Sequence, residues 1–334
     1  MTRIFPPQHR DGSTPLLITV VGPTAAGKTG LAIRIAQALD AHILSSDSRQ
    51  FYREIPIGTA QPTRAERRQA PHHFVDFLSI HQDYSSGRFE ADAAQWLTDH
   101  FAERVEQGRR PVAVMAGGSG LYVQAVHGGL DAMPSSPAER DALNAQHAEH
   151  GLAPLLEELA QRDPDHYAVV DRNNPHRVIR ALEVCRATGG SYSGLRKQNA
   201  SQLAVYEGGW ARHARRPWDT LTLGLGAPRD FLHDRIDRRV LDMMDLGWLE
   251  EARSVLPHRH LNALKTVGYP QLFDVLEGQT DMDTAIRKIQ EATRQFARRQ
   301  LTWFHRQPDV HWVDARRPED GLAVVQTLMK DGRL

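Results

Sequence analysis

The sequence has little cysteine, no long hydrophobic run and no excess of charge of either sign. Cys185 is the single cysteine among 334 residues, which excludes an internal disulfide and a zinc site built from several thiolates. The apolar run Leu16–Val21 is too short to cross a bilayer, and the polar segment before it contains no apolar core of a secretory signal. We therefore expect a cytoplasmic protein with no membrane partner.

The 41 basic residues equal the 41 acidic residues, so no bulk positive charge indicates a polyanionic partner, although a basic face can exist locally. Hydrophobic residues make up 40%, charged residues 25%, and the mean hydropathy is -0.49. These values are typical of a soluble globular protein rather than a disordered one. The length predicts about two domains.

Strand and helix patterns alternate along most of the chain. Short apolar runs that end in glycine or small polar residues predict buried strands, and helical periodicity predicts helices between and after them. The predicted strands are 16–21, 41–44, 111–115, 219–226 and 311–314, and the predicted helices are 29–39, 229–246 and 282–306. This alternation predicts an α/β fold with a doubly wound parallel sheet.

Residues 134–211 break this alternation, because they carry helix signals without a convincing strand. Ser136-Pro137-Ala138-Glu139 is the sequence of a capping box with proline at the first helical position. Asn174-Pro175 repeats the start signal, and the helix that it opens ends at Gly189-Gly190. We predict a core domain of residues 1–133 and 212–334 and an inserted all-helical domain of residues 134–211.

The first strand is followed by a full match to the P-loop pattern, in the strand-loop-helix context that the pattern requires. Backbone N–H groups of such a loop surround phosphates, its lysine neutralises them, and its threonine hydroxyl can ligate Mg²⁺. A fortuitous glycine-rich turn explains this context poorly. The motif predicts a site for a diphosphate or a triphosphate such as ATP and does not establish hydrolysis. Its residues are Gly22, Pro23, Thr24, Ala25, Ala26, Gly27, Lys28 and Thr29.

The carboxylate that a nucleotide hydrolase usually carries at the end of a second apolar strand is missing here. Residues 116–122 follow the strand 111–115 and contain no acid. Their glycines permit close approach to a ligand and Ser119 offers a hydroxyl, but a plain strand-to-helix turn explains them equally well. Asp47 is the nearest acid, and the rule that ligands bind beyond the carboxyl ends of parallel strands places it beside the P-loop. Taken alone, Asp47 fits a helix N-cap better.

Nine segments together resemble the tRNA dimethylallyltransferase family in order and spacing, over roughly residues 16–315. The segments are GPTAAGKT (22–29), DSRQFYR (47–53), IGTAQP (57–62), HHFVD (72–76), YSSGRFEADA (84–93), GGSGLY (117–122), HRVIRALEV (176–184), TVGYPQ (266–271) and TRQFARRQLTWF (293–304). The resemblance implies transfer of a dimethylallyl group from dimethylallyl diphosphate to the exocyclic amine (N6) of the adenine just 3′ of a tRNA anticodon. It also implies that the P-loop holds a diphosphate leaving group rather than ATP.

The resemblance implies catalytic roles for Asp47 and Ser119. An aromatic amine is a poor nucleophile, so a carboxylate that takes its proton as the C–N bond forms would help. Asp47 is the candidate. Ser119 stands where the family usually has threonine, and its implied role is a hydroxyl bond near the bridging oxygen or the amine.

The same resemblance implies how the leaving diphosphate is stabilised. Lys28, the P-loop amides and a Mg²⁺ ion at Thr29 would neutralise its charge. Arg235 and Arg239 match a helix segment that supplies diphosphate contacts in the family, and ordinary surface arginines are the alternative.

The tRNA contacts implied by the resemblance lie in four parts of the chain. We expect the partner to be the tRNA anticodon stem-loop and the protein to be a monomer. His176 and Pro270 depart from the family's usual glutamine and arginine. The implied residues are Asp47, Ser48, Arg49, Gln50, Arg140, His176, Arg177, Val178, Ile179, Arg180, Lys265, Thr266, Val267, Gly268, Tyr269 and Pro270.

Charge is distributed unevenly along the chain. Residues 286–306 hold six basic residues and one acidic residue, and residues 171–216 hold nine and three, whereas residues 134–170 hold two and seven. A solvated helix face usually explains such a run. Two basic stretches around a phosphate site favour RNA binding instead.

Two other functions remain open at this point. A P-loop small-molecule kinase would share the phosphate loop and the acid near the second strand, and would need a lid with phosphate-binding arginines. A non-catalytic RNA-binding module with a relic P-loop would bind tRNA without turnover, although Asp47 and Ser119 in register with the loop disfavour it.

Overall fold

The structure is a computed structural model that describes residues 14–130, 133–199, 205–207, 210–212 and 216–330. It divides into two compact units. The α/β unit comprises Met1–Gly129 and Ala204–Leu334, and the helical unit comprises Leu130–Leu203.

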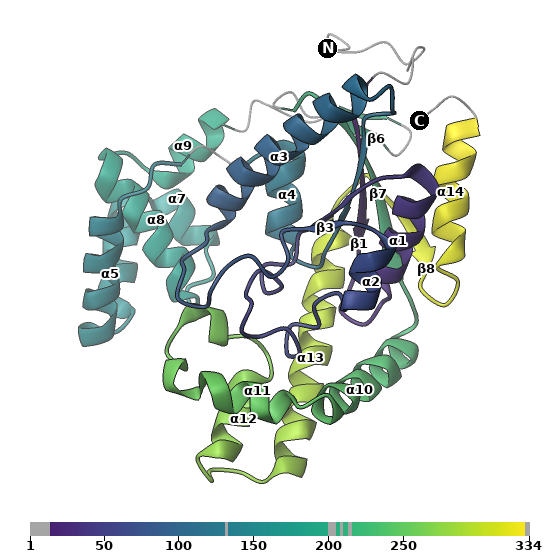
Figure 1. Ribbon diagram of the computed structural model, residues 1–334. Helices are drawn as coiled ribbons and strands as arrows, with labels where there is room; N and C mark the ends of the chain where they lie inside the picture. Colours follow the sequence, from purple (N-terminus) through teal and green to yellow (C-terminus); the bar gives the residue numbers. More distant parts are fainter. Residues whose placement is uncertain (1–13, 131–132, 200–204, 208–209, 213–215, 331–334) are drawn as a thin grey trace. The chain divides into compact units, whose positions relative to one another are not determined.

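In the described part of the chain, the strands of the α/β unit form one sheet in the order β3-β2-β4-β1-β7-β6-β5, and β8 also pairs with β7 (Figure 1). Parallel pairing joins β3, β2, β4, β1, β7 and β8, whereas β5 and β6 are antiparallel. The strands are β1 (Leu16–Val21), β2 (Ile43–Ser45), β3 (His72–His73), β4 (Val112–Ala116), β5 (Val205–Glu207), β6 (Trp210–Arg212), β7 (Asp219–Gly226) and β8 (Val310–Asp314).

Helices cover both faces of this sheet. Those before the helical unit are α1 (Lys28–Leu39), α2 (Arg64–Gln69), α3 (Ser86–Glu106) and α4 (Gly120–Gly128). Those after it are α10 (Arg229–Asp245), α11 (Trp248–Val255), α12 (Tyr269–Leu276), α13 (Met282–Phe304) and α14 (Glu319–Lys330), with 3-10 turns at Leu256–His258 and Asn262–Leu264. None of the helices that the structure describes combines the length and the apolar composition needed to cross a bilayer.

Alternation along β1 explains why the sheet is covered on both sides. Leu17 and Val21 pack in one core with α3 and α4, and Ile18 and Val20 pack in a second core with α1 and α14. Figure 1 shows α3 and α4 on one side of the sheet and α1 and α14 on the other. Successive side chains of a strand point to opposite faces, so a buried run of apolar residues needs partners on both. The predicted doubly wound sheet is confirmed.

The register of three strands brings three loops to one edge of the sheet. β1 pairs with β4 as far as Val20 opposite Ala116, and β2 pairs with β4 as far as Ser45 opposite Ala116. Because the strands are parallel, the chain leaves all three at the same edge. The P-loop after β1, the segment of Asp47 after β2 and the segment of Ser119 after β4 therefore start side by side.

The helical unit begins and ends differently from the predicted insertion of 134–211. It contains α5 (Pro137–His150), α6 (Ala153–Arg162), α7 (Pro164–Val169), α8 (Pro175–Thr188) and α9 (Tyr192–Asn199). It ends at Leu203, because β5 and β6 form an antiparallel pair that extends the sheet beyond β7. Strands of three residues are too short to show alternation in a sequence.

The helix starts predicted inside this unit are observed. The Ser136 hydroxyl accepts from the Glu139 N–H at 3.4 Å, and the Asn174 side chain accepts from the Arg177 N–H at 3.3 Å. α8 ends at Gly189, whose φ of 69° is left-handed. The Glu139 carboxylate lies 3.6 Å from Arg186, an ion pair that the capping-box pattern does not foresee.

Glu183 is the buried charge of the helical unit, and its side chain has no exposed area. It accepts from Arg140 at 2.7 Å and from the Ser136 N–H at 3.0 Å, and it pairs with Arg180 at 2.9 Å. Burial by itself raises the pKa of Glu183, but these hydrogen bonds outweigh it and hold the pKa below the ordinary value.

We predict that Glu183→Gln lowers the stability of the helical unit by about 2 kcal/mol, because two arginines lose their charged acceptor. Hydrogen exchange of α8 amides at pH 7 measures this. The loss should shrink as the pH falls below 4.5, where Glu183 of the unfolded wild type takes up a proton, and should vanish below the lowered pKa of the folded protein. Exposed Glu157→Gln is the control, with a change within about 0.5 kcal/mol. Equal effects of both variants would contradict a structural role for Glu183.

Candidate active site

The P-loop is shaped by two glycines with positive φ. Gly22 has φ 142° and lies so close to β7 that a Cβ atom there would be 2.6 Å from the Leu225 carbonyl oxygen. Gly27 has φ 92° and precedes α1 directly. Lys28 and Thr29 therefore occupy the first turn of α1, where backbone N–H groups and the helix dipole favour an anion.

Lys28 lies among charged groups of this site. Its Nζ donates to the Pro23 carbonyl at 2.8 Å. Burial lowers the pKa of Lys28 to about 8, the charge of Asp47 raises it, and the charge of Arg239 lowers it. The fold thus places a carboxylate and a guanidinium within electrostatic reach of the P-loop lysine.

Asp47 begins a turn and not a helix. Its Oδ1 accepts from the Arg49 N–H at 3.1 Å, and its own N–H donates to the Ser45 hydroxyl at 3.3 Å. Residues 48–50 are a turn, so the alternative role of Asp47 as a helix N-cap is wrong. The partly exposed carboxylate lies at the carboxyl edge of the sheet with the P-loop.

Ser119 faces the segment of Asp47. Its hydroxyl accepts from the Ser48 N–H at 3.2 Å and lies 3.3 Å from the Ser48 hydroxyl. Although Ser119 precedes α4, its side chain forms no hydrogen bond that caps this helix. The hydroxyl therefore has a partner outside its own turn, which a plain strand-to-helix turn would not require.

The two arginines of α10 also belong to the site. Arg235 Nε donates to the Ala25 carbonyl of the P-loop at 2.7 Å. Burial lowers the pKa of Arg239, and the charge of Asp47 raises it. Arg235 is thus exposed but bonded to the phosphate loop, and Arg239 is partly buried within electrostatic reach of Asp47.

Two further segments are hydrogen-bonded to the segment that contains Asp47. Gln50 Nε2 donates to the Ala60 carbonyl at 3.1 Å, and Arg49 Nη1 donates to the Asn262 carbonyl at 3.0 Å. Glu251 accepts from the Ile57 N–H, the Gly58 N–H and the Tyr269 hydroxyl at 2.8, 2.8 and 2.6 Å. Sequence reasoning missed Glu251, which joins the 57–62 segment to the start of α12.

The predicted tRNA residues differ in exposure. In the α/β unit, Lys265 and Pro270 are exposed, whereas Gly268 and Tyr269 are buried. Thr266 and Val267 are partly buried.

In the helical unit, His176 and Arg177 are exposed, and Val178 and Ile179 pack in the core. Any contact of this segment with RNA is left to the first two side chains. Arg140 and Arg180 are committed to Glu183.

Only some of the basic side chains of α13 are exposed. Arg287, Lys288, Arg298 and Arg299 are exposed. Arg294 instead donates to both carboxylate oxygens of Asp237 on α10, at 2.9 and 2.8 Å. The positive charge that this helix can offer to a polyanion is therefore smaller than the number of its basic residues suggests.

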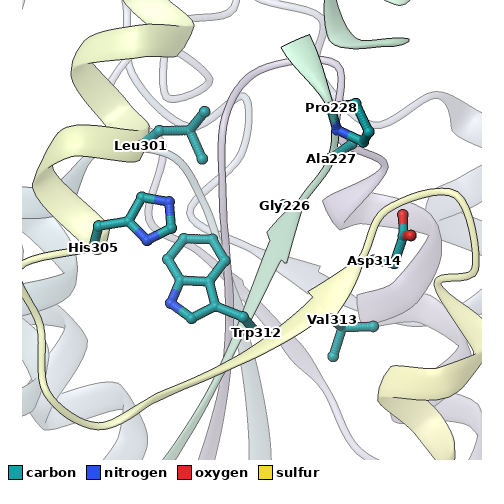
Figure 2. Close-up of a pocket in the computed structure, with 8 residues that line it drawn as sticks. All are labelled: Gly226, Ala227, Pro228, Leu301, His305, Trp312, Val313 and Asp314. Carbon is teal, nitrogen blue, oxygen red and sulfur yellow. The ribbon is translucent and has the colours of Figure 1, made fainter.

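A pocket of about 370 Å³ lies where β7 and β8 end beside α13 (Figure 2). Trp312 lies against Gly224 and Gly226, and its ring stacks on that of His305 with the centroids 4.1 Å apart. No P-loop residue and no Asp47 lines this pocket. Its residues are Gly226, Ala227, Pro228, Leu301, His305, Trp312, Val313 and Asp314.

Comparison with known proteins identifies one family. The IPP transferase family matches residues 50–307. The chain is 43% identical over 299 residues to the tRNA dimethylallyltransferase of Christiangramia forsetii, covering 89% of this chain and 93% of that protein. It is 40% identical over 315 residues to tRNA dimethylallyltransferase 1 of Bacteroides fragilis, covering 94% and 98%.

Solved structures of similar proteins have the same fold. The tRNA isopentenylpyrophosphate transferase of Bacillus halodurans is 30% identical, with a TM-score of 0.64 over 95% of this chain and 97% of that one. A eukaryotic dimethylallyltransferase is 24% identical, with a TM-score of 0.73 over 90% and 74%. That last likeness bears on the fold alone.

We predict that the affinity for dimethylallyl diphosphate falls above pH 8, because Lys28 then loses the proton that attracts the anion. The dissociation constant should rise by up to about tenfold per pH unit. Lys28→Arg should show no such fall between pH 8 and 10, since a guanidinium stays protonated. Isothermal titration at several pH values measures both. Parallel pH profiles of the two proteins would exclude Lys28 as the titrating group.

Proposed function

Because the chain belongs to the IPP transferase family, the family of the tRNA dimethylallyltransferases, we propose that it transfers a dimethylallyl group from dimethylallyl diphosphate to N6 of the adenine 3′-adjacent to a tRNA anticodon, releasing diphosphate. The observation that carries this proposal is the meeting of Asp47, Ser119 and Lys28 at one edge of the sheet. The match to the tRNA dimethylallyltransferase of Christiangramia forsetii covers 89% of this chain at 43% identity, which favours prenyl transfer over a small-molecule kinase.

The donor site uses the cations around the P-loop. Lys28, Arg235 and Arg239 come from two helices and meet at this loop. They bind the diphosphate and stabilise the charge that develops on it as the C–O bond breaks. Arg239 also lies within electrostatic reach of Asp47.

Magnesium fits this site through Thr29. Within the described residues, no group of three or more His, Cys, Asp or Glu could hold a metal ion, so a cage made of protein ligands is not available. Mg²⁺ is usually held by one or two protein oxygens together with substrate phosphates and water. The hydroxyl of Thr29, on the first turn of α1, would be the protein ligand, and the ion would supply charge neutralisation of the diphosphate.

Asp47 is the proposed general base. As N6 attacks the allylic carbon, the C–O bond to the diphosphate breaks and the N6 proton passes to the Asp47 carboxylate. The Arg49 N–H holds one carboxylate oxygen in place. The Ser119 hydroxyl, fixed by Ser48, is placed to hydrogen-bond near the amine or the bridging oxygen.

The acceptor is the anticodon stem-loop, and the protein acts as a monomer. Exposed basic residues on α13 and the exposed His176, Arg177 and Lys265 contact its phosphates. The target adenine must leave the base stack to reach Asp47. An anticodon stem-loop with guanine at this position should bind through its phosphates and fail to react.

Two labelled substrates test the proposed function. The wild-type chain should move radiolabelled dimethylallyl from its diphosphate onto tRNA, and nucleoside analysis should find the label on the adenine next to the anticodon. It should move no label from γ-labelled ATP to a small molecule. Phosphoryl transfer without prenyl transfer would replace this proposal by the kinase.

We predict that Asp47→Asn lowers the single-turnover rate by at least about 100-fold, because it removes the proton acceptor. Dissociation constants for tRNA and dimethylallyl diphosphate should change by less than about tenfold, a loss confined to the transition state. Asp40→Asn is a matched control, since Asp40 pairs with Arg109 at the opposite edge of the sheet. A near-normal rate for Asp47→Asn would assign the base to another group.

We predict that tRNA affinity falls steeply with salt, because binding releases counterions from phosphates. Neutralising Arg298 together with Arg299 should reduce the slope of log K against log salt by up to about two units. Arg109→Gln should leave it unchanged, because Arg109 precedes β4 at the opposite edge of the sheet and pairs with Asp40 at 2.9 Å. Filter binding at several salt concentrations measures the slopes. An unchanged slope for the double variant would remove α13 from the RNA surface.

A further inference from the structure

Gln300 is a buried polar residue on the apolar face of α13. The buried positions of this helix are Ala285, Ile289, Ala297, Gln300 and Phe304, and Gln300 is 6% exposed. A buried amide needs partners for both its oxygen and its NH₂ group. Gln300 finds them in two different loops of the candidate site.

The Gln300 side chain joins the P-loop to the segment of Ser119. Its Oε1 accepts from the Thr24 N–H at 2.8 Å, and its Nε2 donates to the Gly118 carbonyl at 3.0 Å. The Gln300 amide lies directly against Gly118, because a Cβ atom there would lie 2.2 Å from the Gln300 nitrogen and would displace it. The amide is therefore fitted closely between the two loops.

The backbone alone does not hold these loops together. The ladder between β1 and β4 ends at Val20 and Ala116, with one more bond from the Gly117 N–H to the Val20 carbonyl at 3.2 Å. Thr24 and Gly118 lie beyond it. A side-chain amide offers one acceptor and one donor, so it can bridge an N–H group of one loop and a C=O group of the other.

A neighbouring side chain and an ion pair support the same arrangement. Trp303, one turn further along α13, packs where a Cβ atom of Gly120 would lie, at 2.2 Å. Arg294 binds Asp237 on α10, the helix that carries Arg235 and Arg239. Helix α13 thus contacts the P-loop, the segment of Ser119 and the arginine helix.

We propose that Gln300 is a positioning residue that sets the spacing between the P-loop and Ser119, and so aligns the diphosphate of the donor with the groups that act on the amine. This inference rests on the proposed function of these loops as the donor site. Because the Thr24 N–H donates to Gln300, the phosphates would be bound by the N–H groups that follow Thr24 in the loop.

The first test removes both hydrogen bonds with Gln300→Met, which keeps the length of the side chain. We expect kcat/KM for dimethylallyl diphosphate to fall at least about tenfold, because small misplacements of reacting groups are costly. The KM for tRNA should stay within about threefold. Gln295→Met, exposed on the same helix and bonded to Glu291, should change kcat/KM less than about twofold.

The second test uses a change of protonation with Gln300→Glu. The ionised carboxylate can accept from Thr24 but repels the Gly118 carbonyl, whereas the protonated form restores both bonds. Burial raises the pKa of such a carboxyl. The ratio of its kcat/KM to that of the wild type should therefore rise at least about fivefold from pH 9 to pH 6. The same ratio for Gln300→Met should stay constant.

The outcomes separate this inference from the proposed function. Wild-type kinetics for Gln300→Met, or equally flat pH ratios for both variants, would overturn the positioning role. Calorimetric binding of inorganic diphosphate needs no tRNA and no turnover, and we expect it to weaken at least about fivefold in Gln300→Met. Weakened binding with no prenyl transfer by the wild type would refute the proposed function and leave the positioning role standing.

Discussion

Parallel pairing of β4 with both β1 and β2 is the constraint on which the site depends. The pairs end together, with Val20 and Ser45 both opposite Ala116, so three loops start at the same level on three neighbouring strands. A slip of one residue would turn the side chains of a strand to the wrong face and move its loop along the sheet. The two apolar cores that fix this register therefore also fix the distance between Lys28 and Asp47.

Because several segments meet at this edge of the sheet, their cationic side chains lie close together. Burial lowers the pKa of both Lys28 and Arg239. The charge of Arg239 lowers the pKa of Lys28 further, and the charge of Arg235 lowers the pKa of Arg239. Asp47 offsets part of this cost, and a bound diphosphate would offset the rest. Perturbed groups of this kind are typical of functional sites. The free protein thus holds an electrostatic preference for an anion before any anion arrives.

The two faces of helix α13 have different roles. Its buried face places Gln300 and Trp303 against Gly118 and Gly120. Its exposed face carries Arg298 and Arg299, which we assign to tRNA. Arg294 lies between these faces and binds Asp237 of α10. The donor loops and the proposed RNA surface therefore share one rigid element, which limits how far either can move independently.

The sequence determined the sheet, the P-loop, the helix starts at Ser136 and Asn174, and the family, because these depend on local periodicity, caps and motif spacing. It indicated Asp47 only through the rule for strand ends, and only the tertiary structure showed that Asp47 starts a turn and lies within electrostatic reach of Lys28. The short strands β5 and β6 escaped prediction because three residues show no period. Gln300 belongs to the segment 293–304 that carries part of the family resemblance, and it is a polar residue on an apolar helix face. Its hydrogen bonds in the tertiary structure explain why a polar residue stands there. Its partners, Thr24 and Gly118, are 276 and 182 residues away in the chain. Contacts over such separations are decided by packing between elements, which no local pattern encodes.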